Sequence, residues 1–281
     1  MGVSDLFRDS ISIVTGGAAG IGRAMCVQLA AAGARAIIVA DINAEAAEQT
    51  ASEICKRRGR AESAHLDVSN QAQVDALVSN TVANHGRLDF MFNNAAIAAV
   101  GEFRDGNLAD FRRIIDVNLF GVVYGTLAAY RIMLQQQSGH IINTASMTGL
   151  LPSPIISAYS ASKWAIIGFS EAVRYEAAAF GIKISVACPG LVKTDIADRS
   201  MYWNVRKEDY LRWLPWMRMA EKPEKTAAAI LRGAARNKEM IIFPFAAKIA
   251  WQLHTIFPWL LRPMFRQTIN GFRGIRIDQK T

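Results

Sequence analysis

Short apolar runs alternate with helical stretches along most of the chain, and this alternation is the feature that most constrains its fold. The runs contain few polar residues, which is typical of strands buried on both faces of a parallel sheet. Parallel neighbours need right-handed helical crossovers, and these place helices on both sides of the sheet. Strands are predicted at residues 10–14, 36–40, 61–66, 88–92, 140–144, 182–187 and 240–243, and helices at 21–32, 44–58, 70–85, 108–137, 156–180 and 223–236. The sequence therefore predicts one α/β domain, residues 1–243, on a doubly wound parallel sheet of about seven strands.

A glycine-rich turn joins the first predicted strand to the first predicted helix. It reads Thr15-Gly16-Gly17-Ala18-Ala19-Gly20-Ile21-Gly22. Glycine permits a positive φ angle and lets the backbone approach a ligand closely, and a helix start offers unpaired N–H groups to a pyrophosphate. A tight turn without a ligand is the alternative. The strand before the turn, the helix after it and an acidic residue downstream favour a Rossmann-like dinucleotide-binding site.

That acidic residue is Asp41, which lies 19 residues beyond Gly22 at the end of the second predicted strand. A carboxylate there can accept hydrogen bonds from the adenosine ribose and would repel a 2′-phosphate. Neither Ile42 nor Asn43 is a cation. The sequence therefore predicts NAD as the cofactor, with NADP as the alternative because Arg23 is a cation nearby.

Tyr159 and Lys163 are four residues apart in a predicted helix, so their side chains lie on one face about one turn apart. A phenol has an ordinary pKa of about 10, and a neighbouring ammonium would lower the pKa of Tyr159. Such a pair can exchange a proton with a substrate oxygen. The alternative is an ordinary helix with one tyrosine near one lysine, so the interpretation depends on the rest of the chain.

Together these motifs make residues 8–243 resemble the short-chain dehydrogenase/reductase family. The turn from Thr15 to Gly22 matches the family's glycine-rich motif, and the run 93–95 is similar to the family's Asn-Asn-Ala-Gly stretch. Ala96 departs from the final glycine of that stretch and should slightly crowd the backbone near the cofactor. Together with the Asp41 argument, the resemblance implies cofactor contacts at Gly16, Ala19, Gly20, Ile21, Gly22, Asp41, Ile42, Asp67, Val68, Asn94, Ala95, Tyr159, Lys163, Pro189, Gly190, Val192 and Thr194.

The resemblance also implies a catalytic set of Asn118, Ser146, Tyr159 and Lys163. Tyr159 would take the proton of an alcohol as general base and return it in the reverse direction. Lys163 would lower the pKa of Tyr159 and hold the nicotinamide ribose. Ser146 would donate to the developing oxyanion, and Asn118 would fix a water that relays the proton from Lys163 towards solvent.

Cysteine and histidine usage argues against several other classes of protein. The three cysteines (Cys26, Cys55 and Cys188) lie far apart and are odd in number, which indicates a reducing compartment and no disulfide framework. The four histidines show no metal-ligand spacing, so no metal site is predicted. The N-terminal residues lack the apolar segment of a secretory signal. We therefore expect a cytoplasmic protein.

Positive charge is concentrated in the C-terminal part of the chain. Residues 1–198 carry a net charge of −2, whereas residues 199–281 carry +10. A basic surface can attract nucleic acid, but no base-stacking platform or known reader module accompanies it, so no nucleic-acid partner is predicted. An anionic membrane surface, an acidic substrate and an inert solvated face are the alternatives.

Residues 194–222 occupy the place where the family has its substrate lid. Aromatic and aliphatic residues recur there at helical spacing, with charged residues between them. One interpretation is a short amphipathic helix packed on the body, and the other is a lid that forms an apolar pocket; the two are compatible. A bulky hydrophobic substrate is expected, with candidate contacts at Thr148, Trp203, Tyr210, Trp213 and Met217.

Residues 244–281 form an apolar and basic extension beyond the last predicted strand. Pro258, Pro263 and the charges of Lys248 and Arg262 interrupt its apolar run, which argues against a membrane-spanning helix. The favoured interpretation is a tail packed on the same domain, at a subunit interface or over the substrate mouth. The alternative is an amphipathic element that makes the enzyme peripheral to a membrane. The resemblance implies a homodimer or homotetramer built through the helices near 108–137 and 156–180.

The expected function is an NAD-dependent oxidoreductase that interconverts a secondary alcohol and a ketone on a bulky hydrophobic substrate. An NADP-linked carbonyl reductase is the alternative among enzymes. A non-catalytic nucleotide-binding scaffold is the alternative from another class. The four residues of the implied catalytic set argue against the scaffold, because a protein that only binds nucleotide would not require all of them.

Overall fold

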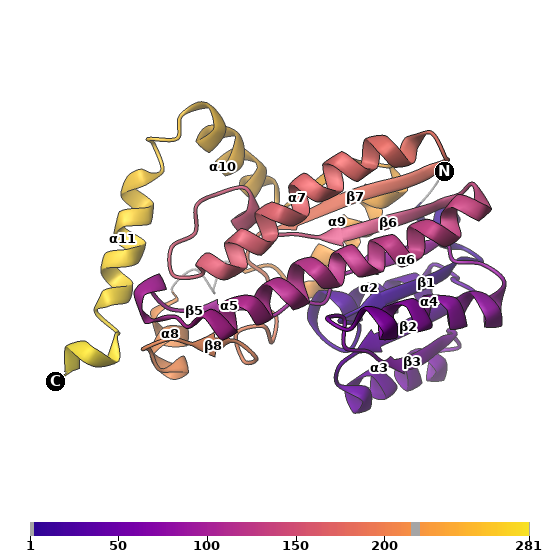
Figure 1. The fold of residues 1–281 in the computed structure, drawn as a ribbon, viewed down its shortest axis with the longest axis horizontal. Helices are drawn as coiled ribbons and strands as arrows, with labels where there is room; N and C mark the ends of the chain where they lie inside the picture. The colour runs from indigo at the N-terminus through magenta and orange to yellow at the C-terminus, as the bar shows by residue number, and fades with distance from the viewer. Residues whose placement is uncertain (1–2, 215–219, 281) are drawn as a thin grey trace.

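The computed structural model describes residues 3–214 and 220–280 and contains a parallel sheet of seven strands among them (Figure 1). The strand order is β3-β2-β1-β4-β6-β7-β9. The strands are β1 Ile11–Thr15, β2 Ala36–Asp41, β3 Ala61–His65, β4 Phe90–Asn93, β6 Gly139–Thr144, β7 Ile182–Pro189 and β9 Met240–Phe243. The predicted doubly wound α/β fold is confirmed, and each predicted strand lies within two residues of an observed one at either end.

Helices cover both faces of the sheet, and each face has its own apolar core. One core packs β1 and β2 against α2 (Gly20–Ala31), α3 (Ala44–Lys56) and α9 (Pro223–Ala235). The other packs the opposite face against α4 (Gln71–His85), α6 (Gly121–Gln136) and α7 (Ser157–Ala178). A short helix, α1 (Val3–Phe7), buries Phe7 against Phe90 in the first core. Because both faces are covered, the central strands are mostly apolar, and polar residues within them such as Asn93, His140 and Asn143 are buried.

The chain leaves β1 and β4 towards opposite sides of the sheet, although the two strands are neighbours. The strand that follows β1 is β2 on one side, and the strand that follows β4 in the sheet is β6 on the other. In open α/β sheets a ligand binds beyond the carboxyl ends of the strands at such a reversal. The glycine-rich turn after β1 and the segment after β4 both lie at this position.

The long helical stretch predicted at 108–137 consists of three consecutive segments. α5 (Leu108–Ile115) leads into a π-helical turn, η2 (Asp116–Phe120), which leads into α6. The stretch from Leu108 to Gln136 is long and apolar enough to span a bilayer by length and composition alone. It packs against β4, β6 and α4, however, which is the position of a core helix. A methyl group at Gly125 would lie 2.0 Å from Asn93 Oδ1, so this glycine allows the close approach of α6 to the sheet.

A second, two-stranded parallel sheet lies beyond the carboxyl ends of the main strands. It pairs β5 (Ala99–Val100) with β8 (Met201–Tyr202), and short 3₁₀ turns, η1 (Phe103–Asp105) and η3 (Met147–Gly149), lie in the neighbouring loops. The helix α8 (Lys207–Trp213) follows β8. β8 and α8 belong to the segment predicted as a substrate lid, 194–222, of which residues 215–219 lie outside the described part of the chain.

The C-terminal extension forms an arm on the side of the molecule opposite β2 and β3 (Figure 1). α10 (Phe245–Ile256) begins directly after β9, and α11 (Arg262–Arg273) leads to a final 3₁₀ turn, η5 (Ile277–Lys280). Ala247 and Trp251 of α10 pack on the core cluster around β7, and Phe272 of α11 is fully buried in a cluster with Trp213 of α8. The extension therefore contacts the body at both of its ends.

Candidate active site

The glycine-rich turn has the geometry that a ligand-binding backbone needs. Gly16 and Gly20 have φ angles of 63° and 51°, a region that favours glycine. A Cβ on Gly16 would lie 2.9 Å from the Cα of Ala95, and a Cβ on Gly22 would lie 2.0 Å from the Gly16 carbonyl oxygen. The N-cap of α2, Ala19, provides no side-chain hydrogen bond. The first N–H groups of α2 are therefore free to bind an anionic group.

Asp41 is held in place by the turn that it faces. Its buried carboxylate accepts hydrogen bonds from the Ala18 N–H at 3.1 Å and from the Asn43 N–H at 3.0 Å. Arg23, the nearby cation that would favour NADP, forms an ion pair with Glu53. Glu53 is also paired with Arg57 at 2.8 Å. Asp41 therefore places a carboxylate at the end of β2, while the positive charge of Arg23 is already paired with Glu53.

Asn94 and Thr15 connect the end of β4 to the glycine-rich turn. The Thr15 hydroxyl accepts hydrogen bonds from the N–H groups of Asn94 at 2.9 Å and Ala95 at 3.1 Å. The Asn94 amide in turn donates to the Thr15 carbonyl oxygen at 3.2 Å. Thr15 was not among the predicted site residues. Its place directly before the glycines is the signal that would have identified it.

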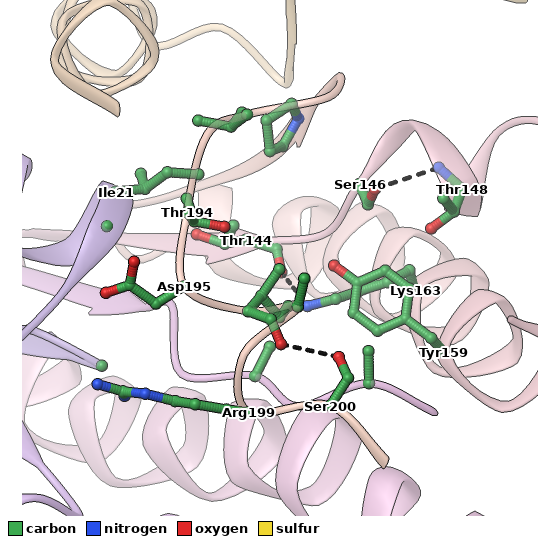
Figure 2. A pocket seen from close by; sticks show the side chains of 18 of the residues that line it. Ile21, Thr144, Ser146, Thr148, Tyr159, Lys163, Thr194, Asp195, Arg199 and Ser200 are labelled. Atoms are coloured by element: carbon green, nitrogen blue, oxygen red, sulfur yellow. Dashed lines mark hydrogen bonds between the residues drawn. The ribbon is translucent and has the colours of Figure 1, made fainter. Parts of the chain in front are cut away.

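Tyr159 and Lys163 project from the first turns of α7 into one cavity (Figure 2). The Lys163 ammonium lies 5.3 Å from the centre of the Tyr159 ring and donates a hydrogen bond of 2.8 Å to the Thr144 carbonyl oxygen. Burial lowers the pKa of Lys163 to about 7 and raises the pKa of Tyr159 to about 12, against the opposing effect of the Ser146 hydroxyl. The expected lowering of the Tyr159 pKa by Lys163 is therefore wrong for the protein without ligands. Burial of the phenol is the larger effect on its pKa, and the Lys163 ammonium is itself desolvated.

Ser146 and Thr148 lie on the loop that follows β6 and line the same cavity (Figure 2). The Ser146 Oγ accepts a hydrogen bond of 3.2 Å from the Thr148 N–H, which fixes the hydroxyl at the start of the η3 turn. Among the described residues, the buried Oγ1 atoms of Thr144 and Thr148 have no hydrogen-bond partner. Both residues line the cavity, but these two oxygens are themselves buried, so a ligand reaches them only if the side chains rotate.

Asn118 is buried in the π-helical turn and does not line the cavity. Its Nδ2 group donates to the Ile97 carbonyl oxygen at 2.9 Å and to Ser162 Oγ at 3.1 Å, and its Oδ1 accepts from the Ile97 N–H at 2.8 Å. These bonds tie the segment after β4 to α7. In this geometry the side chain positions the site and has no free donor for a relay water.

The cavity has a volume of about 380 Å³ and lies between the glycine-rich turn, α7 and the segment after β7. Most of the predicted site residues line it. From the cofactor set these are Gly16, Ala19, Gly20, Ile21, Asp41, Asn94, Ala95, Tyr159, Lys163, Pro189, Gly190, Val192 and Thr194, and from the others Ser146, Thr148 and Tyr210.

Four predicted cofactor residues lie away from the cavity wall: Gly22, Ile42, Asp67 and Val68. Gly22 packs behind the turn against Gly16. Ile42 is exposed beside Asp41, and Val68 is buried against Gly121. The Asp67 carboxylate accepts hydrogen bonds from the Ser69 N–H at 3.0 Å and hydroxyl at 2.7 Å. Asp67 therefore closes a turn after β3 and does not face the cavity.

Two of the predicted substrate contacts point elsewhere. Trp203 is buried in an apolar cluster with Ala99 and Ile114, where its indole N–H donates to Asp110 at 2.8 Å. Trp213 makes an edge-to-face contact with Phe272, with 5.9 Å between ring centres. Helical spacing identified apolar residues but did not tell which neighbour they contact. Met217 lies outside the described residues.

The lid residues that do line the cavity come mainly from its first part. Asp195, Ile196, Ala197, Arg199 and Ser200 form this wall, and Asp195 and Arg199 lie on the side away from Tyr159 (Figure 2). The prediction passed over them in favour of the aromatic residues further along. Their position directly after Thr194 was the available signal. Among the described residues, no group of three or more His, Cys, Asp or Glu side chains is placed to hold a metal ion.

Comparison with known proteins identifies the family. The family model described as short chain dehydrogenase matches residues 10–204. The chain belongs to the short-chain dehydrogenase/reductase family. It is 34% identical over 220 residues to a 3-oxoacyl-acyl-carrier-protein reductase of Synechocystis sp., which covers 78% of this chain and 87% of the relative. It is also 34% identical over 230 residues to levodione reductase of Leifsonia aquatica, covering 79% and 86%.

A solved structure agrees with this assignment. The short-chain dehydrogenase/reductase of Burkholderia phymatum in complex with NAD superposes with a TM-score of 0.82 at 27% identity, covering 91% of this chain and 96% of that one. The predicted family and enzyme class are therefore confirmed. The protein is an oxidoreductase that acts on CH–OH or carbonyl groups, and its family binds NAD(P).

Proposed function

We propose that this short-chain dehydrogenase/reductase uses NAD to interconvert a secondary alcohol and a ketone on an apolar substrate. The observation that carries the cofactor choice is the buried Asp41 carboxylate, held by two backbone N–H groups at the end of β2. A carboxylate there suits free ribose hydroxyls and repels a phosphate. Arg23, the cation that could have balanced a phosphate, is engaged by Glu53.

The residues present fit a nicotinamide dinucleotide. Gly16 and Gly20 present bare backbone to the cavity where the pyrophosphate would bind, and Asp41 would hold the ribose. At the other end of the cavity Pro189, Gly190 and Thr194 would enclose the nicotinamide. The bound cofactor supplies the hydride chemistry, while the protein supplies binding, orientation and proton handling.

The chain's own residues would manage the proton of the substrate oxygen. In the alcohol-to-ketone direction the substrate hydroxyl gives its proton to the Tyr159 oxygen, and in the reverse direction Tyr159 returns it. The Ser146 hydroxyl would donate a hydrogen bond to the same substrate oxygen as negative charge develops on it. Lys163, with a pKa of about 7, can hold or release a proton beside the phenol at neutral pH. Asn118 would hold the segment after β4 against α7 through its hydrogen bonds to Ile97 and Ser162.

The cavity wall near Tyr159 supports an apolar substrate. Val100, Met147, Ile156, Leu191 and Ile196 line it with Tyr210, whose ring packs edge-on against Tyr202 at 5.7 Å. Apolar walls with a few placed polar groups are typical of sites for small hydrophobic ligands. Two relatives are named as reductases, of 3-oxoacyl-acyl-carrier-protein and of levodione, which supports a carbonyl group as the site of reaction.

A panel of cyclic, aryl and aliphatic secondary alcohols, each offered with NAD and with NADP, tests this proposal by the appearance of reduced cofactor. We expect turnover of apolar alcohols with NAD to exceed turnover with NADP by at least about tenfold. Preference for NADP would contradict the proposal that the Asp41 carboxylate excludes a 2′-phosphate. Absence of turnover with every alcohol, and with the corresponding ketones and reduced cofactor, would favour a binding protein over an enzyme.

A further inference from the structure

The outward face of α10 is apolar where a surface helix normally carries polar residues. Phe245, Ile249, Leu253 and Ile256 follow one another at spacings of four, four and three residues, so they form one stripe along the helix. All four are exposed, Phe245 by 73% and Ile256 by 67% of its surface. The opposite face of the same helix packs Ala247 and Trp251 on the core around β7. The exposed stripe is therefore additional to the face that holds α10 on the protein.

The apolar surface continues through the turn between α10 and α11. Phe257, Trp259, Leu260 and Met264 are exposed as well, Trp259 by 61% of its surface. Phe257 and Trp259 pack edge-to-face on each other, with 6.3 Å between ring centres. We refer to residues 245–273 as the C-terminal arm. Exposed apolar surface of this extent is unusual on a soluble protein unless something binds to it.

Cations border this surface, and acids are missing from it. The sequence contains no Asp or Glu between Met240 and Ile277. Lys248, Arg262 and Arg266 are exposed on the arm. In the described ranges, 3–214 and 220–280, none of these three has a carboxylate within ion-pair distance. The arm therefore presents large apolar side chains together with free positive charge.

The arm is fixed to the body at both ends, so this surface has a defined position. Phe272 is buried against Trp213, and Arg273 and Arg276 bind the buried carboxylate of Glu102. Within the arm, His254 of α10 packs on Phe265 of α11 with 6.1 Å between ring centres. The exposed turn between the helices lies away from the sheet (Figure 1).

We propose that the C-terminal arm is a docking surface for an anionic lipid bilayer, with the α10 stripe and the α10–α11 turn entering the headgroup region. Large apolar side chains, tryptophan included, flanked by Lys and Arg are the composition of an interfacial membrane element. A second copy of this chain fits less well. A symmetric contact through the arm would bring two basic copies of it together, without a carboxylate in the arm to balance Lys248, Arg262 and Arg266. This proposal does not depend on the cofactor or substrate.

Vesicle co-sedimentation of the full-length protein tests the proposal. Phosphatidylcholine vesicles with and without phosphatidylglycerol are the probes, each at low and at high salt. We expect binding to the anionic vesicles at low salt, weaker binding at high salt, and at least about tenfold weaker binding to phosphatidylcholine alone. Failure to bind anionic vesicles at low salt would overturn the proposal.

Two variants locate the surface. Ile256→Ser/Trp259→Ser should weaken binding by at least about tenfold, because it removes apolar side chains from the bilayer. Lys248→Glu/Arg262→Glu/Arg266→Glu should abolish the preference for anionic lipid, at about fivefold per cation removed. Matched controls are Phe103→Ser/Leu108→Ser, which removes exposed apolar residues elsewhere, and Lys56→Glu/Arg60→Glu/Lys183→Glu, which reverses exposed charges elsewhere.

The proposal requires both arm variants to lose binding and both controls to keep it. Equal losses in the arm variants and the controls would overturn it, because binding would then be a general property of the surface.

Light scattering of the same samples without lipid tests whether a second copy of the chain covers the arm instead. If Ile256→Ser/Trp259→Ser converts an oligomer to a monomer, the arm is a subunit interface and the lipid proposal is wrong. Turnover of a water-soluble substrate should be unchanged in the arm variants, so failure here is distinct from failure of the proposed function.

Discussion

Tyr159 and Lys163 form a buried pair whose protonation equilibria move in opposite directions. Burial raises the pKa of the phenol to about 12 and lowers that of the ammonium to about 7. Both shifts favour the neutral forms, since an apolar surrounding penalises charge. At neutral pH the phenol is a proton donor, which suits reduction of a carbonyl. Oxidation of an alcohol needs a further positive charge near the pair, and oxidised nicotinamide would bring one into the cavity.

The buried ammonium should cost the protein stability in a pH-dependent way. The folded pKa of Lys163 is about 7 and the ordinary value is 10.5, so between these pH values the unfolded chain binds more protons. The destabilisation caused by Lys163 therefore becomes smaller as the pH increases from about 7 to 10.5, and the free energy of unfolding rises. We expect Lys163→Met to stabilise the protein by about 2–4 kcal/mol at pH 6, with a smaller gain at pH 9.

Urea unfolding at the two pH values measures this difference. Lys183→Met, at an exposed lysine, controls for the general loss of a positive charge. An identical effect of Lys163→Met at both pH values would show that the buried group does not titrate in this range. Tyr159 does not interfere, because its raised pKa of about 12 affects stability only above its ordinary value of 10.

Asp41 should decide the choice of cofactor. Asp41→Ala is expected to weaken NAD binding by about ten- to a hundredfold, through lost hydrogen bonds to the ribose, and to weaken NADP binding much less. Titration of protein fluorescence with each cofactor measures both constants. Because Asp41 also accepts hydrogen bonds from Ala18 and Asn43, the melting temperature without cofactor shows whether the turn has been damaged. An equal loss for the two cofactors would mean that Asp41 does not distinguish them.

Some site residues could be predicted because a single local rule fixes them. Glycines between a strand and a helix, an acid at a strand end, and a Tyr and Lys four apart on a helix each need only the neighbouring sequence. Trp203 and Trp213 could not be predicted in this way. Their partners, Asp110 and Phe272, are far away in the chain, and only the tertiary structure shows that both rings turn from the cavity.

The same contrast holds among the elements. The alternation of apolar runs and helical stretches was sufficient for the main sheet, because strands buried on both faces have little choice of environment. The small β5–β8 sheet was missed, since two-residue strands carry no pattern. The π-helical turn at Asp116–Phe120, which packs against α7, was also missed, because its composition does not differ from that of an ordinary α-helix.

The contact between α8 and α11 links the lid to the C-terminal arm. Phe272 is fully buried against Trp213, in a cluster that includes Tyr210 of the cavity wall. Phe272→Ala should cost about 3–5 kcal/mol of stability through the cavity that it leaves. Hydrogen exchange should also become faster in α8 and α11, while the central strands keep their relative protection.

Phe265→Ala is the matched control, because Phe265 lies in the same helix but is only half-buried and contacts α10. It should leave exchange in α8 unchanged. Unchanged exchange in α8 after Phe272→Ala would show that the lid does not depend on the arm.

At the scale of the whole molecule, exposed apolar residues gather on the continuous helical stretch of η2 and α6 and on α7, as well as on the arm. Leu127 lies seven residues from the exposed Phe120, and Tyr175 lies eleven from the exposed Trp164, so each pair shares one helix face. These are the helices through which the family resemblance implies assembly. We therefore expect a homodimer or homotetramer in solution, in which α6 and α7 meet their copies.

Light scattering after gel filtration tests the assembly. Leu127→Asp/Tyr175→Asp should shift the mass to that of one chain, 30.8 kDa, because charges would be buried in the contact. Phe103→Asp, at an exposed residue of the η1 turn, should leave the mass unchanged. A wild-type protein that is already monomeric would contradict this arrangement.

The central claim is that Tyr159 exchanges the proton during NAD-linked oxidation and reduction, and Tyr159→Phe tests it most directly. The variant keeps the ring packed in α7 and removes only the hydroxyl. We predict that kcat with an apolar secondary alcohol falls by about a thousandfold, while the NADH dissociation constant changes by no more than about twofold. Residual turnover near that of the wild type, with NADH still bound, would contradict the assignment.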